Sequence, residues 1–157
     1  MDQLPEVDDL KAAVDYLCKL PQVDKKNIFA VGHSVGGTNV VLLSEIDSRL
    51  KKVAACGAYA DFDRGVYYEQ LRPYEKVDKE HQLRSFGMWT SDLHCPVLFC
   101  FGGNDPVEKA YSVQAQDMQV EAEKHKKQVR VELLPGYDHF QAFLPSLNKI
   151  VPFFEEK

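Results

Sequence analysis

The chain has 157 residues, a length that fits a single domain, and its 45% hydrophobic and 27% charged residues are ordinary for a globular protein. The formal net charge is −5 and the lysines are scattered, which argues against nucleic-acid binding by electrostatics. No apolar run is long enough to span a bilayer, and the first residues lack a signal-peptide pattern, so a cytoplasmic location is expected.

The hydrophobic pattern predicts helices and strands in alternation. In chain order the expected elements are a helix over 7–20, a strand over 27–32, a helix over 36–46, a strand over 53–59, a strand over 96–101, a helix over 107–127, a strand over 129–134 and a helix over 140–154. This alternation predicts an α/β fold, with a mostly parallel sheet of about four strands covered by helices on both faces. The alternating pattern of 129–134 places that strand at a sheet edge.

The segment 60–94 interrupts this order. It is polar and aromatic, with no clean period, and a connection of this length in a compact domain is usually functional or has short helices of its own. We therefore expect one domain over 1–157 with a cap-like insertion at about 60–94. Four aromatic residues in it are candidates for a substrate pocket: Phe62, Tyr67, Tyr68 and Trp89.

The segment Gly32-His33-Ser34-Val35-Gly36 matches the G-x-S-x-G pattern and lies between a predicted strand and a predicted helix. A nucleophilic serine must stand on a sharp turn so that its hydroxyl projects above the sheet, and glycines on either side remove clashes in that strained turn. Gly37 leaves room for the helix to pack close to the strand. Ser34 is therefore the candidate nucleophile, at the start of a helix whose dipole favours negative charge.

Two further residues follow separate predicted strands. Asp105 comes after the strand at 96–101, and His139 comes after the strand at 129–134. Carboxyl ends of parallel strands share one rim of the sheet, so Asp105 can orient the imidazole of His139, which in turn takes the proton of Ser34. Asp61 and Asp63, after the strand at 53–59, remain alternative acids.

No metal or cofactor site is expected. His81, His94 and His125 have no metal-ligand spacing, and the chain has neither a P-loop nor a G-x-G-x-x-G segment. The four cysteines form no C-x-x-C pair and are expected to be reduced and structural; they are Cys18, Cys56, Cys95 and Cys100.

The segments VDKKNIFAVGHSVGG, FGGNDP and PGYDHF resemble the elbow, acid loop and histidine loop of the α/β-hydrolase superfamily, in its dienelactone hydrolase and prolyl-oligopeptidase-like branch. The resemblance covers nearly the whole chain apart from 60–94. It implies catalytic roles for Ser34, Asp105 and His139, and an oxyanion-binding role for the backbone N–H of Val35. It also implies strands before the first helix, which this chain lacks, so the expected core is truncated.

This truncation would leave the apolar strand 27–32 at an open edge. A second subunit is the favoured cover, which predicts a homodimer; a missing N-terminal segment or the insertion are the alternatives. The second oxyanion donor is unassigned for the same reason, and loss of one donor typically costs about 10²–10³ in rate.

These observations predict a serine hydrolase that cleaves small acyl esters, in the manner of a carboxylesterase, through an acyl-enzyme intermediate. A peptidase or thioesterase would use the same triad. The alternative from another class is a non-catalytic or crippled α/β-hydrolase fragment that acts by association.

Overall fold

The central element is a four-stranded parallel sheet. The computed structural model describes residues 5–59 and 82–156. Its strands are β1 (Ile28–His33), β2 (Leu50–Cys56), β3 (Val97–Gly102) and β4 (Val129–Leu134), and they pair in the order β1-β2-β3-β4. The predicted α/β class is therefore confirmed, and the strand predicted at an edge, β4, is an edge strand.

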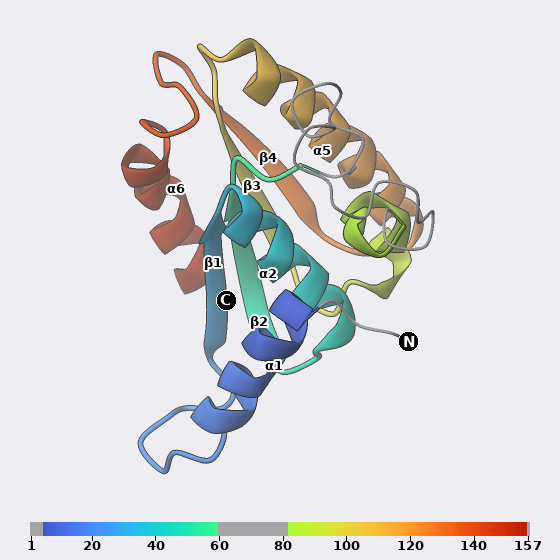
Figure 1. Cartoon of the computed structure of the whole chain (residues 1–157), viewed down its shortest axis with the longest axis vertical. Coiled ribbons are helices and arrows are strands. Elements are labelled where there is room, and N and C mark those ends of the chain that lie inside the picture. Colours follow the sequence, from blue (N-terminus) through green and yellow to red (C-terminus); the bar gives the residue numbers. More distant parts are fainter. Residues whose placement is uncertain (1–4, 60–81, 157) are drawn as a thin grey trace.

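Helices cover both faces of this sheet (Figure 1). One face carries α1 (Pro5–Leu17), α2 (Val35–Ile46), the 3₁₀ helix η1 (Phe86–Asp92) and α5 (Pro106–Lys124), and the other carries α6 (Phe143–Glu155). Side chains alternate between the two faces along each strand. In β2, Val53 and Ala55 pack toward α2 and α5, whereas Ala54 and Cys56 pack toward α6.

The core on the larger face contains three stacked phenylalanines. The ring centroids of Phe86 and Phe99 lie 5.5 Å apart, and those of Phe99 and Phe101 lie 6.1 Å apart. All three side chains are fully buried, and burial of each contributes roughly 1.5–3 kcal/mol. Phe86 belongs to η1, so the end of the predicted insertion is part of the core of the domain.

Among the strands, β2 differs most from the sequence prediction, and β1 and β3 differ by one residue. β2 was expected over 53–59 but begins at Leu50 and ends at Cys56. Lys52 is buried in this strand because its Nζ donates hydrogen bonds to the carbonyl oxygens of Phe153 (2.6 Å) and Glu156 (2.7 Å) at the end of α6. Gly57, with φ of 60°, ends the strand.

The predicted insertion is described in part. Residues 60–81 lie outside the described residues, and with them the candidate pocket residues Phe62, Tyr67 and Tyr68 and the alternative acids Asp61 and Asp63. Residues 86–92 form η1. Within 5–59 and 82–156, no helix has the length and apolar character needed to cross a membrane.

Candidate active site

Ser34 occupies the sharp turn between β1 and α2. Its backbone has φ of 56° and ψ of −123°, a conformation that a non-glycine residue adopts only under strain. Its N–H donates to the carbonyl of Cys56 at the end of β2 (2.8 Å), so the turn is held against the neighbouring strand. This is the geometry that the elbow pattern predicts.

The glycines of the elbow have different roles. A Cβ at Gly32 would lie 2.1 Å from the carbonyl oxygen of Gly36, so glycine is required there. A Cβ at Gly37 would lie 3.1 Å from the carbonyl of Cys56, in agreement with close helix-to-strand packing. At Gly36, no described atom lies within 4 Å of the added carbon. The expectation that glycine relieves a clash on both sides of Ser34 is therefore wrong for Gly36.

Val35 is the first residue of α2. The first N–H groups of a helix have no acceptor within the helix. The N–H of Val35, next to Ser34, is therefore not used by a hydrogen bond of α2. The Val35 side chain is half-exposed. The oxyanion-binding role of this N–H stays a prediction.

His139 lies in the loop between β4 and α6 and is packed against the elbow. The Nε2 of His33 lies 2.9 Å from the backbone carbonyl of His139, and the centroids of the two imidazole rings are 4.6 Å apart. On another side, Gly57 is so close that a Cβ there would lie 2.7 Å from both Nδ1 and Cε1 of the His139 ring. His139 is thus held at the rim that also carries Ser34.

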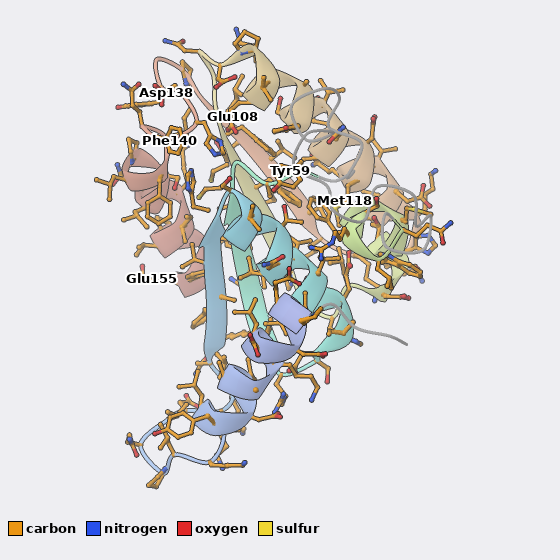
Figure 2. All side chains as sticks on the ribbon, in the orientation of Figure 1. Tyr59, Glu108, Met118, Asp138, Phe140 and Glu155 are labelled. Atoms are coloured by element: carbon orange, nitrogen blue, oxygen red, sulfur yellow. The ribbon has the colours of Figure 1, made fainter. Side chains whose placement is uncertain are left out.

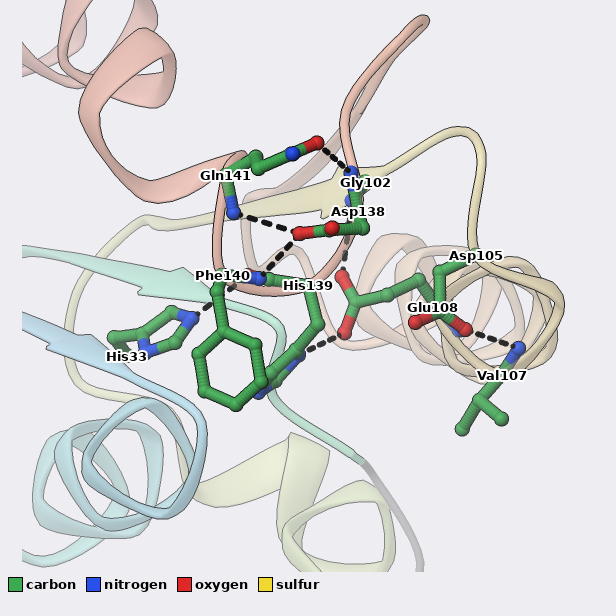
Figure 3. Close-up of polar contacts among 9 residues, drawn as sticks. All are labelled: His33, Gly102, Asp105, Val107, Glu108, Asp138, His139, Phe140 and Gln141. Carbon is green, nitrogen blue, oxygen red and sulfur yellow. Dashed lines mark hydrogen bonds and ion pairs between the residues drawn. The ribbon is translucent and has the colours of Figure 1, made fainter.

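The carboxylate that meets His139 belongs to Glu108, and this corrects the sequence prediction. Nδ1 of His139 lies 2.5 Å from Oε1 of Glu108 (Figure 3). Asp105 instead accepts hydrogen bonds from the N–H groups of Val107 (2.8 Å) and Glu108 (3.3 Å) as the N-cap of α5. An aspartate followed by proline at the first helical position is a strong helix start, and that local role uses Oδ1 of the Asp105 carboxylate.

A signal for Glu108 was present in the sequence. The buried face of α5 consists of Glu108, Ser112, Ala115, Met118 and Ala122, which follow one another at spacings of three and four. This spacing places Glu108 on the apolar stripe that faces the sheet. A carboxylate on such a stripe needs a buried partner, and His139 was the candidate at the same rim.

Asp138, next to His139 in this loop, has its hydrogen bonds within the loop. Oδ1 of Asp138 accepts from the N–H groups of Phe140 (3.0 Å) and Gln141 (2.8 Å), so Asp138 shapes the turn after His139. Figure 2 shows Asp138, Phe140 and Glu108 together at one end of the molecule.

Within the described residues, no hydrogen bond joins Ser34 Oγ to His139. In enzymes without bound substrate, the contact between a nucleophile and its base is often long.

Trp89, the described member of the predicted pocket, lies elsewhere. Its indole N–H donates to the carbonyl of Gln82 (2.9 Å), within the segment that leads into η1. The N–H of His94, just after η1, donates to the carbonyl of Ser44 in α2 (2.9 Å). Ser44 is ten residues beyond Ser34, which corresponds to roughly 15 Å along a helix. The structure therefore does not bring Trp89 to the rim that carries Ser34 and His139.

Two thiols lie beneath the rim on the α6 face. Cys56 and Cys100 are neighbours across β2 and β3, and Cys56 Sγ lies 3.1 Å from Ser146 Oγ. The hydrogen bond with Cys56, together with burial, raises the pKa of Cys100. All four cysteines are free, and these two are buried, so they pack as small apolar side chains. In the described part of the chain, no three His, Cys, Asp or Glu side chains are arranged to hold a metal ion.

Comparison with known proteins identifies the family of this chain. The acetyl esterase Axe7A of Xylanibacter ruminicola is 30% identical over 109 residues, which cover 60% of this chain and 24% of that protein. A puromycin-hydrolyzing peptidase of Mycobacterium tuberculosis superposes with a TM-score of 0.81 at 20% identity, over 95% of this chain and 25% of that one. An acylaminoacyl peptidase of Pyrococcus horikoshii does so with a TM-score of 0.76 at 15% identity, over 96% and 27%.

The chain thus spans about a quarter of the length of these relatives. The two solved structures share its α/β-hydrolase fold. The family model described as the dienelactone hydrolase family matches residues 3–151, and the chain belongs to that family.

Proposed function

We propose that the protein is a serine hydrolase that cleaves small acyl esters through an acyl-enzyme intermediate. The observation that carries the proposal is the strained turn of Ser34 at the same rim as an imidazole that is hydrogen-bonded to a buried carboxylate. An activated serine needs this pairing of nucleophile and oriented base. Membership of the dienelactone hydrolase family and similarity to a protein named acetyl esterase support the same reaction class.

In the proposed reaction, His139 takes the proton of Ser34 Oγ as the oxygen attacks the acyl carbonyl. The N–H of Val35 stabilises the oxyanion that forms. The proton then passes to the leaving alcohol, and water with His139 as base releases the acid and restores the serine.

The surroundings of the site support an ester with an apolar part. Val35, next to Ser34, is 50% exposed, and Phe140, next to His139, is 79% exposed. Two exposed apolar side chains beside the reacting groups favour contact with hydrocarbon rather than with a charged substrate.

Four free cysteines agree with a reducing compartment, so a cytoplasmic location remains part of the proposal.

The test is covalent labelling with a fluorophosphonate, followed by intact mass. A single adduct on the wild type, absent from Ser34→Ala, is the expected result, because only a serine with a working base attacks this reagent. Turnover of short p-nitrophenyl esters, lost in the same variant, completes it. A folded wild-type protein without adduct and without turnover contradicts the proposal and favours the alternative, a fragment that acts by association.

Peptide cleavage is the second candidate, since two of the similar structures are named peptidases. Those chains are about four times as long as the part that this chain matches. Aminoacyl anilides assayed beside the esters separate the two substrate classes with the same protein sample.

A further inference from the structure

Glu108 is a buried carboxylate with both oxygens engaged. The residue is 1% exposed. Oε2 accepts from the N–H of Gly102 at the end of β3 (2.9 Å), and Oε1 lies against Nδ1 of His139. Because the backbone N–H fixes one oxygen, the other is held toward the imidazole.

The backbone at the ends of β2 and β3 lies close to this pair of side chains. A Cβ at Gly57 would lie 3.0 Å from Oε1 of Glu108 as well as 2.7 Å from the His139 ring. A Cβ at Gly102 would lie 2.6 Å from the carbonyl oxygen of Asp138. Two glycines at the ends of β2 and β3 therefore permit the close approach of the histidine loop to Glu108.

We propose that Glu108, and not Asp105, is the carboxylate that positions His139 and stabilises its charged form during turnover. The inference rests on the proposed serine hydrolase function and deepens it. Asp105 acts one step away: as N-cap of α5 it sets the start of the helix whose first turn carries Glu108.

The chemistry follows from the tautomer of the imidazole. A carboxylate at Nδ1 accepts a hydrogen bond, so the neutral ring carries its proton on Nδ1 and leaves Nε2 free to accept the proton of Ser34. When Nε2 becomes protonated, the negative charge of Glu108 lies beside the imidazolium. No proton needs to pass to the carboxylate.

Glu108→Gln separates this role from a structural one. The amide oxygen can keep the hydrogen bond from Gly102, and the amide NH₂ then faces Nδ1 of His139. That donor forces the proton onto Nε2, which is the wrong tautomer for a base. By comparison with the same change in a serine protease triad, we expect kcat to fall by about 10³–10⁴-fold with KM nearly unchanged.

Three further variants complete the experiment. Glu108→Asp retains the carboxylate on a shorter side chain and should restore part of the lost kcat. Asp105→Asn retains a good N-cap without the charge, so it should leave kcat within a few fold of the wild type. The Nδ1 proton of His139 is expected to give a far-downfield signal in the ¹H NMR spectrum, and loss of that signal in His139→Ala assigns it. The signal should persist in Asp105→Asn and disappear in Glu108→Gln.

The result that overturns the inference is a large kcat loss and a lost downfield proton in Asp105→Asn, with Glu108→Gln near the wild type. Equal melting temperatures of Glu108→Gln and the wild type exclude an effect through folding. Failure of the proposed function is a different outcome, in which the wild type itself neither binds fluorophosphonate nor turns over esters. The NMR comparison still decides between the two carboxylates in that case.

Discussion

At the scale of single residues, Gly57 and Gly136 allow the effect of a clash to be separated from the effect of backbone strain. Gly57 has φ of 60°, and a Cβ there would collide with the His139 ring. Gly136, in the same loop as His139, has φ of 89° with no described atom within 4 Å of an added Cβ. The two glycines therefore share a backbone requirement but differ in what lies beside them.

We expect Gly57→Ala and Gly136→Ala each to lose about 1–2 kcal/mol of stability because alanine is strained at positive φ, and Gly57→Ala to lose more than Gly136→Ala because its Cβ also collides with the His139 ring. Only Gly57→Ala should displace His139, and a shift of about 1 Å in a catalytic group costs on the order of 10²-fold in rate. Urea denaturation and kcat/KM for a p-nitrophenyl ester measure the two effects. Equal activities of the two variants would show that Gly57 does not set the position of the histidine.

The sequence predicted that Ser34 and His139 lie at one rim of the sheet, and it missed Glu108 as the residue that contacts His139. Ser34 follows β1 directly and His139 lies in the loop after β4. The carboxyl ends of parallel strands meet at one rim, so the topology predicts that the two residues lie at the same rim. The carboxylate that contacts His139 is harder to predict, because nearby carboxylates can instead form local hydrogen bonds. Asp105 caps the start of α5. The spacing along α5 places Glu108 on the buried stripe of that helix, but its contact with His139 is seen only in the structure.

At the scale of elements, Arg49 contacts both α1 and the end of α2. It donates to Asp47 at the end of α2, where the side chain of Asp47 is 3% exposed, and its Nη1 lies 2.6 Å from Oδ1 of Asp15 in α1. The hydrogen bonds from Arg49 hold the pKa of Asp47 below its ordinary value. Arg49 thus links α1 to the turn between α2 and β2.

Arg49→Gln should lower the free energy of unfolding at pH 7 by about 1–3 kcal/mol, because it leaves a buried carboxylate short of hydrogen bonds. The pKa of Asp47 is lower in the folded chain than in the unfolded one, so this contribution is full above the unfolded value of about 3.9 and is lost as the pH falls below it. Denaturation curves of wild type and variant should therefore converge in acid.

Lys11→Gln is the matched control. Lys11 pairs with the same Asp15 at 3.7 Å, but both side chains are more than 40% exposed. Exposed pairs of this kind contribute about 0–1 kcal/mol. A stability loss in Lys11→Gln as large as that in Arg49→Gln would indicate that the pairing of the exposed Asp15, rather than that of the buried Asp47, dominates.

Elements were predicted with correct type and order, since strands buried on both faces and helices with an apolar stripe have distinct patterns. The predicted bounds of β2 were wrong, because the strand includes Lys51 and Lys52 and ends at Cys56. The partners that make Lys52 compatible with a buried strand are carbonyl groups about a hundred positions away, at the end of α6. No local pattern contains that information.

At the scale of the whole molecule, one side of the sheet is apolar and open. The edge of β1 opposite β2 pairs with no strand in the described part of the chain, and Val31 in it is 45% exposed. The outer face of α6, which stacks on β1 through Phe154 and Phe29, exposes Leu144, Leu147 and Val151. Open strand edges and apolar helix faces of this kind promote association.

We therefore predict that the chain self-associates through β1 and α6. Light scattering behind size-exclusion chromatography should give a dimer for the wild type, and the paired substitution Leu144→Glu and Val151→Glu should give a monomer. Val113→Glu, at a 55% exposed position of α5 on the other face of the sheet, is the control and should remain a dimer. A wild type that is monomeric at the highest concentration would contradict the prediction.

The peptide hydrogen bonds described at the rim have a further consequence. The N–H of Ser34 donates to Cys56, that of Gly57 to Cys100, and that of Gly103 to Leu134, so the ladder of the sheet continues into the turns that hold the reacting groups. These amides belong to the sheet and should exchange with solvent as slowly as its strands. The relative positions of Ser34 and His139 should therefore be lost only when the core unfolds. On heating, activity and folded structure should be lost at the same temperature.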